Sequence, residues 1–116
     1  TFIGHHSHLA CTENQSKLLI GDKGMISSYV QIRTGDSHSI LDAEGNRINH
    51  AQSVIIGDHV WIGEGARVLK GVTLQSDTVI ATGSIVTKSY DKKNVLLAGI
   101  PAKIIKENIT WQSERL

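Results

Sequence analysis

Large aliphatic residues recur at every sixth position through the second half of the chain. They occupy six consecutive sites of this period: Ile56, Ile62, Val68, Leu74, Ile80 and Val86. Four positions after each of the first five stands a small or β-branched residue: Val60, Ala66, Val72, Thr78 and Ser84. A period of six matches neither the helical period of 3.6 nor the alternation of a simple strand. The pattern predicts a short strand followed by a turn in each unit, with three units making one triangular coil.

Stacked coils of this kind form a parallel β-helix, in which each coil buries its apolar face against its neighbours. We therefore predict an all-β fold with successive coils at 56–73 and 74–91. The same phase appears upstream at Ile20, Ile26 and Ile32, and an irregular earlier coil is expected before them. Aromatic residues make up only 4% of the chain, which fits a narrow interior filled by aliphatic side chains.

Two segments leave the repeat. Residues 33–53 are polar and rich in turn-forming residues, and we predict that they form a loop extruded from the β-helix. A long loop that leaves a regular solenoid is usually functional. After residue 88 the repeat ends, and residues 98–116 are predicted to form a turn and a short cap, with Ile104–Trp111 covering the last coil. All of these parts belong to a single domain, 1–116.

Charge and composition narrow the classes of function. Twelve basic residues against eleven acidic ones give no argument for binding nucleic acid or an anionic membrane surface. No apolar stretch has the length of a membrane span. The single cysteine, Cys11, rules out an intrachain disulfide and fits a reducing compartment, so a cytoplasmic location is expected. The chain opens on Thr1 rather than Met, and we expect that a leading segment is missing from this sequence.

Four short motifs, in this order and spacing, resemble the left-handed β-helix acyltransferases. The motifs are Ile32–Ile40, Ile56–Gly63, Ile80–Lys88 and Ala98–Lys103. That family includes the galactoside, maltose and serine acetyltransferases, and the chain is most similar to its bacterial polysaccharide O-acetyltransferase branch. The left hand of the helix is implied by this resemblance alone, because general rules favour right-handed crossovers.

The resemblance implies a function and an assembly. It implies acetyl transfer from acetyl-CoA to a sugar hydroxyl, of a surface polysaccharide or its precursor. It also implies a homotrimer, with acetyl-CoA lying in a groove between adjacent prisms. The acceptor would be a glycan or another small molecule, and no metal is expected.

His38 is the predicted general base. Acyl transfer to a hydroxyl needs a group that accepts the alcohol proton, and a mostly neutral imidazole suits this role. His38 lies where the repeat gives way to the polar loop, and it aligns with the catalytic histidine of the family. Asp36 is the nearest carboxylate that could hold the imidazole in one tautomer, although a backbone carbonyl could do so instead.

The remaining site predictions follow from the resemblance. Trp61 is expected beside the acetyl-transfer site, as an apolar wall that excludes water from the thioester. The backbone amide near Glu64 is expected to face the thioester carbonyl and stabilise the oxyanion. The predicted contacts to the rest of the acetyl-CoA molecule are Thr82, Gly83, Thr87, Lys88 and Lys103.

Three alternatives remain open. His5, His6 and His8 raise the possibility of a histidine-bound metal, but their spacing and position do not match the β-helix carbonic anhydrases. A second alternative is N-acetylation of an amino sugar. A third is a non-catalytic β-helix that serves only as a trimerisation scaffold, for which the loop at His38, Trp61 and the Thr87–Lys88 pair would be unnecessary.

Overall fold

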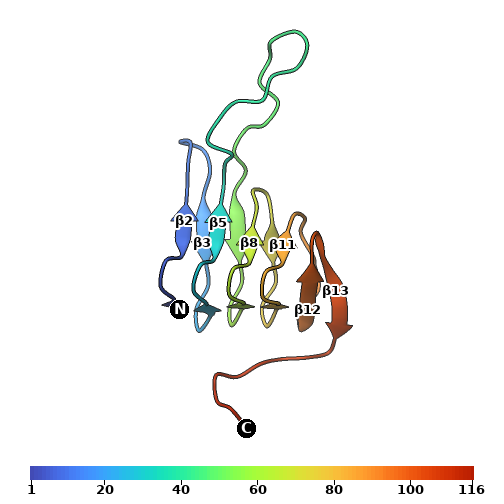
Figure 1. Ribbon diagram of the computed structural model, residues 1–116. Helices are drawn as coiled ribbons and strands as arrows, with labels where there is room; N and C mark the ends of the chain where they lie inside the picture. The colour runs from blue at the N-terminus through green and yellow to red at the C-terminus, as the bar shows by residue number, and fades with distance from the viewer.

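The computed structural model describes residues 1–116 as thirteen short strands wound into a parallel β-helix (Figure 1). The strands are β1 (Phe2–Ile3), β2 (His8–Ala10), β3 (Leu18–Ile20), β4 (Met25–Ile26), β5 (Gln31–Arg33), β6 (Val54–Ile56), β7 (Trp61–Ile62), β8 (Arg67–Val68), β9 (Thr73–Leu74), β10 (Val79–Ile80), β11 (Ile85–Val86), β12 (Val95–Gly99) and β13 (Ala102–Glu107). No helix is present that could cross a membrane.

The strands form the three faces of a triangular prism. Sheet A contains β1, β4, β7, β10, β12 and β13, sheet B contains β2, β5, β8 and β11, and sheet C contains β3, β6 and β9. All pairings are parallel except that of β12 with β13. We call the turns between the faces the A–B, B–C and C–A corners.

The register confirms the predicted coils. Ile62 pairs with Ile80 and Ile56 pairs with Leu74, so equivalent positions in successive coils lie eighteen residues apart. The six aliphatic residues of the repeat are all buried, and each stacks on its equivalent in a neighbouring coil. The small residue four positions later is buried beneath the corner in every unit, because only a small or branched side chain fits there.

Upstream of the regular repeat, the same columns continue across two insertions. Ile26 pairs with Ile62, thirty-six residues later, because the long loop adds the length of one coil between β5 and β6. Ile3 pairs with Ile26, twenty-three residues later, because the polar stretch 12–17 adds five residues to the first coil. Both insertions leave the prism at the B–C corner, so the strands on either side stay in register.

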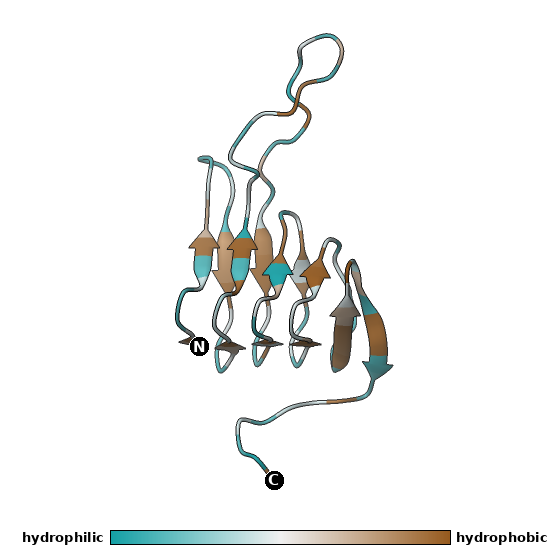
Figure 2. Ribbon diagram, in the orientation of Figure 1, coloured by the Kyte–Doolittle hydropathy of each residue, from teal (hydrophilic) through white to brown (hydrophobic).

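The extruded loop runs from residue 34 to residue 53, since Arg33 still belongs to β5. It projects away from the prism (Figure 1) and is mostly hydrophilic along its length (Figure 2). Its outer half is a tight hairpin, in which Asp42 N–H donates to Asn46 O at 2.8 Å and Ile48 N–H donates to Ile40 O at 2.8 Å. The Asp42 carboxylate accepts the N–H groups of Glu44 and Asn46, which fixes the turn.

The C-terminal segment forms the cap only in part as predicted. Strand β13 folds back antiparallel on β12 and extends sheet A, and Ile104 packs against the core. Residues after Glu107 do not cover the last coil. They run back along the prism, and Ile109 N–H donates to Asn94 O at 3.1 Å. Trp111 lies farther along the same path, at the coil of β7.

Truncation of a stacked aliphatic residue should destabilise the fold far more than truncation of an exposed one. Ile80 is fully buried, whereas Ile105 on β13 is 56% exposed. We expect Ile80→Ala to lower the free energy of unfolding by about 2–5 kcal/mol, through lost burial and the cavity left behind. The matched variant Ile105→Ala should change it by less than about 0.5 kcal/mol. Urea denaturation measures both, and equal losses would contradict the placement of Ile80 in the core.

Candidate active site

His38 lies at the root of the extruded loop, five residues beyond the end of β5 and on the B–C corner. Its side chain is exposed, and its imidazole makes no hydrogen bond within the chain. Its main chain is held, because the side-chain amide of Asn49 donates to His38 O at 2.7 Å. The structure thus presents an unengaged imidazole on a fixed backbone, where an incoming hydroxyl could reach it.

Asp36 does not contact the imidazole. Its Oδ2 accepts a hydrogen bond from Lys70 Nζ at 2.6 Å and another from Asn49 Nδ2 at 3.0 Å. The hydrogen bond from Lys70 is the main reason why the pKa of Asp36 is lowered; the bond from Asn49 and the positive charges of Lys70 and Arg33 add to it, and partial burial opposes it. Asp36 is therefore an ionised anchor of the loop root, and the role of orienting the His38 tautomer stays a prediction.

Trp61 points outward from sheet A and is 37% exposed. Its Nε1–H donates to Ser27 Oγ at 3.3 Å, and its ring lies 5.9 Å from that of Trp111, centroid to centroid. Trp111 in turn stacks on His59 at 4.2 Å and donates its Nε1–H to His59 O at 2.8 Å. Trp61 and Trp111, together with Met25, Gln112 and Ser113, line a small pocket on the outside of sheet A.

Glu64, Thr82 and Gly83 lie together on the A–B corner. Glu64 O accepts the N–H of Gly83 at 2.9 Å, which joins the corners of two successive coils, while the N–H of Glu64 has no partner within the chain. Gly65 and Gly83 both have positive φ, and a Cβ at either position would meet nothing within 4 Å. This corner therefore offers a free backbone donor beside an open surface, the geometry needed for the predicted oxyanion contact.

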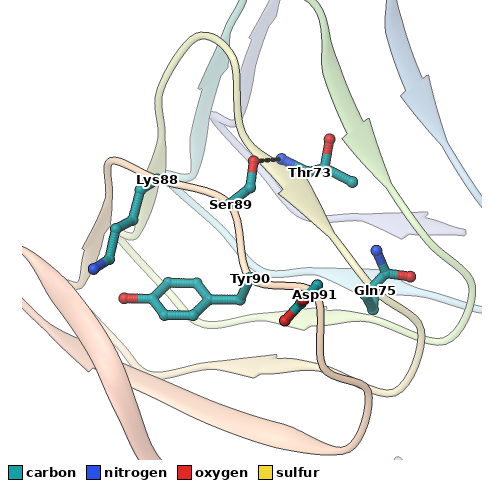
Figure 3. A pocket seen from close by; sticks show the side chains of 6 residues that line it. All are labelled: Thr73, Gln75, Lys88, Ser89, Tyr90 and Asp91. Atoms are coloured by element: carbon teal, nitrogen blue, oxygen red, sulfur yellow. Dashed lines mark hydrogen bonds between the residues drawn. The ribbon is translucent and has the colours of Figure 1, made fainter.

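The other predicted contacts to acetyl-CoA lie in two separate regions of the prism: Lys103 in one, and Thr87 and Lys88 in the other. Lys103 on β13 pairs with Ala98, near the last turn of the A–B corner. Thr87 and Lys88 lie at the opposite end of β11, beyond sheet B. Lys88 lines an open pocket whose other walls are Thr73, Gln75, Ser89, Tyr90 and Asp91 (Figure 3). The Lys88 Nζ lies 5.5 Å from the centre of the Tyr90 ring.

One chain does not bring these predicted residues into a single site. Glu64, Thr82 and Gly83 occupy the A–B corner, whereas His38 and Lys88 belong to the B–C corner, at the other edge of sheet B. No hydrogen bond or ion pair joins the two groups. Within one chain, His5, His6 and His8 are not grouped so that three His, Cys, Asp or Glu side chains could hold an ion.

Comparison with known proteins agrees with this architecture. The family model described as bacterial transferase hexapeptide (six repeats) matches residues 53–88. A polysialic acid O-acetyltransferase of Neisseria meningitidis is 43% identical over 98 residues, covering 84% of this chain and 46% of the relative. The crystal structure of the polySia specific acetyltransferase NeuO superposes with a TM-score of 0.89 at 39% identity, covering 97% of this chain and 51% of that one. In its repeat and its fold, the chain resembles the hexapeptide-repeat acyltransferases.

The β-helix is left-handed, as the resemblance implied, and so are the structures it superposes on. The chain spans about half the length, or less, of the curated relatives it matches. A second polysialic acid O-acetyltransferase, from Escherichia coli O1:K1 / APEC, is 42% identical over 99 residues, which are 84% of this chain and only 32% of that protein.

Three residues near the site of this hexapeptide-repeat protein escaped the sequence analysis. Lys70 could have been found, because the thirty-six-residue register places it one coil above the start of the loop. Asn49 carries no such signal, since it lies in a polar loop without a period. Trp111 lies outside the repeat, and only the path of the C-terminal segment brings it to Trp61.

The ion pair between Asp36 and Lys70 predicts a pH-dependent contribution to stability. The pKa of Asp36 is lowered in the folded protein, so its contribution is present above the unfolded pKa and is lost as the pH falls through the folded one. We expect Lys70→Met to raise the pKa of Asp36, as seen in an NMR titration of the carboxyl carbon. At neutral pH the variant should lose roughly 0.5 kcal/mol, since the pair is partly exposed, and this difference should vanish once the pH falls below the lowered pKa of Asp36 in the folded protein. An unchanged titration would contradict the pairing.

Proposed function

We propose that this chain transfers an acetyl group from acetyl-CoA to a hydroxyl of a sugar, in a surface polysaccharide or its precursor. The similarity to two polysialic acid O-acetyltransferases supports this reaction class. Because the chain spans only part of those proteins, the reaction is inferred for this chain from its own site. The observation that carries the proposal is the His38 imidazole, exposed and unpartnered on a main chain that Asn49 holds in place.

In the proposed reaction, His38 accepts the proton of the acceptor hydroxyl as its oxygen attacks the thioester carbonyl carbon. A carbon–oxygen bond forms and the carbon–sulfur bond breaks, so that the acetyl group leaves the sulfur for the sugar. The proton held by His38 then passes to the departing CoA thiolate. Direct transfer of this kind needs no covalent intermediate on the protein.

The A–B corner is the proposed binding surface for the acetyl end of acetyl-CoA. The free N–H of Glu64 would donate to the oxygen on which negative charge develops, and the open surface at Gly65 and Gly83 would allow the pantetheine arm to lie close to the backbone. Trp61 would exclude water from the thioester. Thr82, Thr87, Lys88 and Lys103 are the further proposed contacts to acetyl-CoA.

We further propose that the active site forms between subunits of a homotrimer. The base and the proposed oxyanion donor lie on different corners of one prism, so the B–C corner of one copy can meet the A–B corner of the next. Exposed aliphatic side chains supply apolar surface for such an interface. They are Leu19 and Ile55 on the outside of sheet C, and Ile40, Leu41 and Ile48 on the loop.

Replacement of His38 tests the chemistry. We expect His38→Ala to lower kcat by about 10²–10⁴-fold, because the acceptor proton loses its base. The measurement is release of CoA thiol from acetyl-CoA in the presence of polysialic acid and a panel of other glycans. His50→Ala, at an exposed histidine of the same loop, is the matched control and should keep native turnover. Native turnover in His38→Ala would remove His38 as the base, and a native protein inactive with every glycan would favour the scaffold alternative.

Mixing two inactive variants tests the shared site. His38→Ala lacks the base, and Thr82→Trp blocks the exposed A–B corner. If sites form between neighbouring copies, refolding the two together should restore activity at up to about a quarter of the sites, because a cyclic trimer pairs intact halves from different subunits. Sedimentation should give a mass three times that of the 12.6 kDa chain. A monomer, or a mixture as inactive as its parts, would contradict the shared site.

A further inference from the structure

Asn49 is the only buried residue in the stretch from Asp36 to Ser53, with 5% of its surface exposed. Its side-chain amide uses its full hydrogen-bonding capacity. The Nδ2 group donates to Asp36 Oδ2 at 3.0 Å and to His38 O at 2.7 Å. The Oδ1 atom accepts the N–H of Ile40 at 2.7 Å and the Nε–H of Arg47 at 3.3 Å. A buried amide with all four bonds made has one fixed orientation, because any other would leave polar atoms unpaired.

These four bonds enclose the segment that carries the proposed base. Two of them reach the main chain at His38 and Ile40, and a third reaches the carboxylate two residues before His38. No backbone hydrogen bond within the chain is made by the N–H groups of Ser37, His38 or Ser39. Besides the Ile48 N–H bond to Ile40 O and the bond from Arg33 on β5 to the Ser37 hydroxyl, the Asn49 side chain supplies the hydrogen bonds that hold this backbone, including the bond to His38 O.

The same amide is tied to the coils on both sides of the loop. Arg47, which donates to Asn49, also forms a two-point ion pair with Glu13, at 3.0 and 2.7 Å, in the coil before the loop. Asp36, which accepts from Asn49, is held by Lys70 in the coil after it. Asn49 thus links the loop root to two neighbouring layers of the prism.

We infer that Asn49 is the positioning residue of this enzyme, which fixes the backbone on both sides of His38 so that the imidazole is held in place for proton transfer. This inference rests on the proposed function, in which His38 is the base. It assigns no contact between Asn49 and the substrates. The donors of the amide are essential, because a carboxylate at this position would face the ionised Asp36 and the carbonyl of His38 without a proton to offer either.

The substitution Asn49→Asp tests this inference with almost no change in side-chain size. Asn46→Asp is the matched control, because Asn46 is exposed in the same loop and its side chain makes no hydrogen bond. The first readout is the NMR order parameter of the His38 and Ile40 amides. In Asn49→Asp it should fall from about 0.85, typical of a rigid backbone, to below about 0.6, while Asn46→Asp should keep the native value.

The second readout is turnover of acetyl-CoA with a glycan that the native protein acetylates. Asn49→Asp should lower kcat by about 10–100-fold, because a small misplacement of a catalytic group costs this much. The KM for acetyl-CoA should stay within about twofold, since the Asn49 amide bonds only to Asp36, His38, Ile40 and Arg47, none of which is a proposed acetyl-CoA contact. A merely structural role would instead reduce the folded fraction, which thermal unfolding would reveal, without this split between kcat and KM.

The outcomes separate the two ideas. If Asn49→Asp matches Asn46→Asp in both the order parameter and kcat, Asn49 does not position His38 and the inference is overturned. If the segment loosens but turnover stays native, Asn49 holds the backbone as inferred and His38 is not the base, which overturns the proposed function. If the segment loosens and kcat falls with KM preserved, both stand.

Discussion

The fold depends on the stacking of each aliphatic side chain directly on its equivalent eighteen residues away. The interior of the prism is narrow. A coil therefore buries its apolar residues mainly against the coils before and after it. The parallel hydrogen bonds between short strands hold that alignment, and the small residues beneath the corners let the chain turn sharply enough to keep it. Every functional feature sits outside this column, on corners and faces that it positions.

The sequence was sufficient for this architecture because the constraint acts on every sixth residue. The columns through Ile62 and Ile80 could be read directly, and the end of the pattern at Ile32 located the extruded loop. The six-residue pattern could not predict the path of segments that lie outside the repeat. Ile104–Trp111 was expected to cover the last coil, but the residues after Glu107 run back to the coil of β7, where Trp111 stacks on His59.

The candidate site was less predictable than the fold for the same reason. His38 and Trp61 could be proposed from motifs, and the corner amide at Glu64 follows from the regular turn. Lys70 could be identified as the partner of Asp36 only from the register of the coils on either side of the loop. The contacts of Asn49 depend on how the loop folds back on itself. Polar contacts inside a loop without a repeat depend on the conformation of that loop. No periodic pattern in the sequence indicates them.

The insertion between β5 and β6 adds the length of one whole coil. By length alone, these residues could therefore wind into an additional coil of the β-helix. A further coil would carry the six-residue phase from Ile32 through residues 38, 44 and 50 before rejoining it at Ile56. Those positions hold His38, Glu44 and His50. Burying three such side chains in an apolar column would cost several kcal/mol each. The proposed catalytic histidine is therefore also one of the residues that prevents the loop from winding into the helix as a competing register.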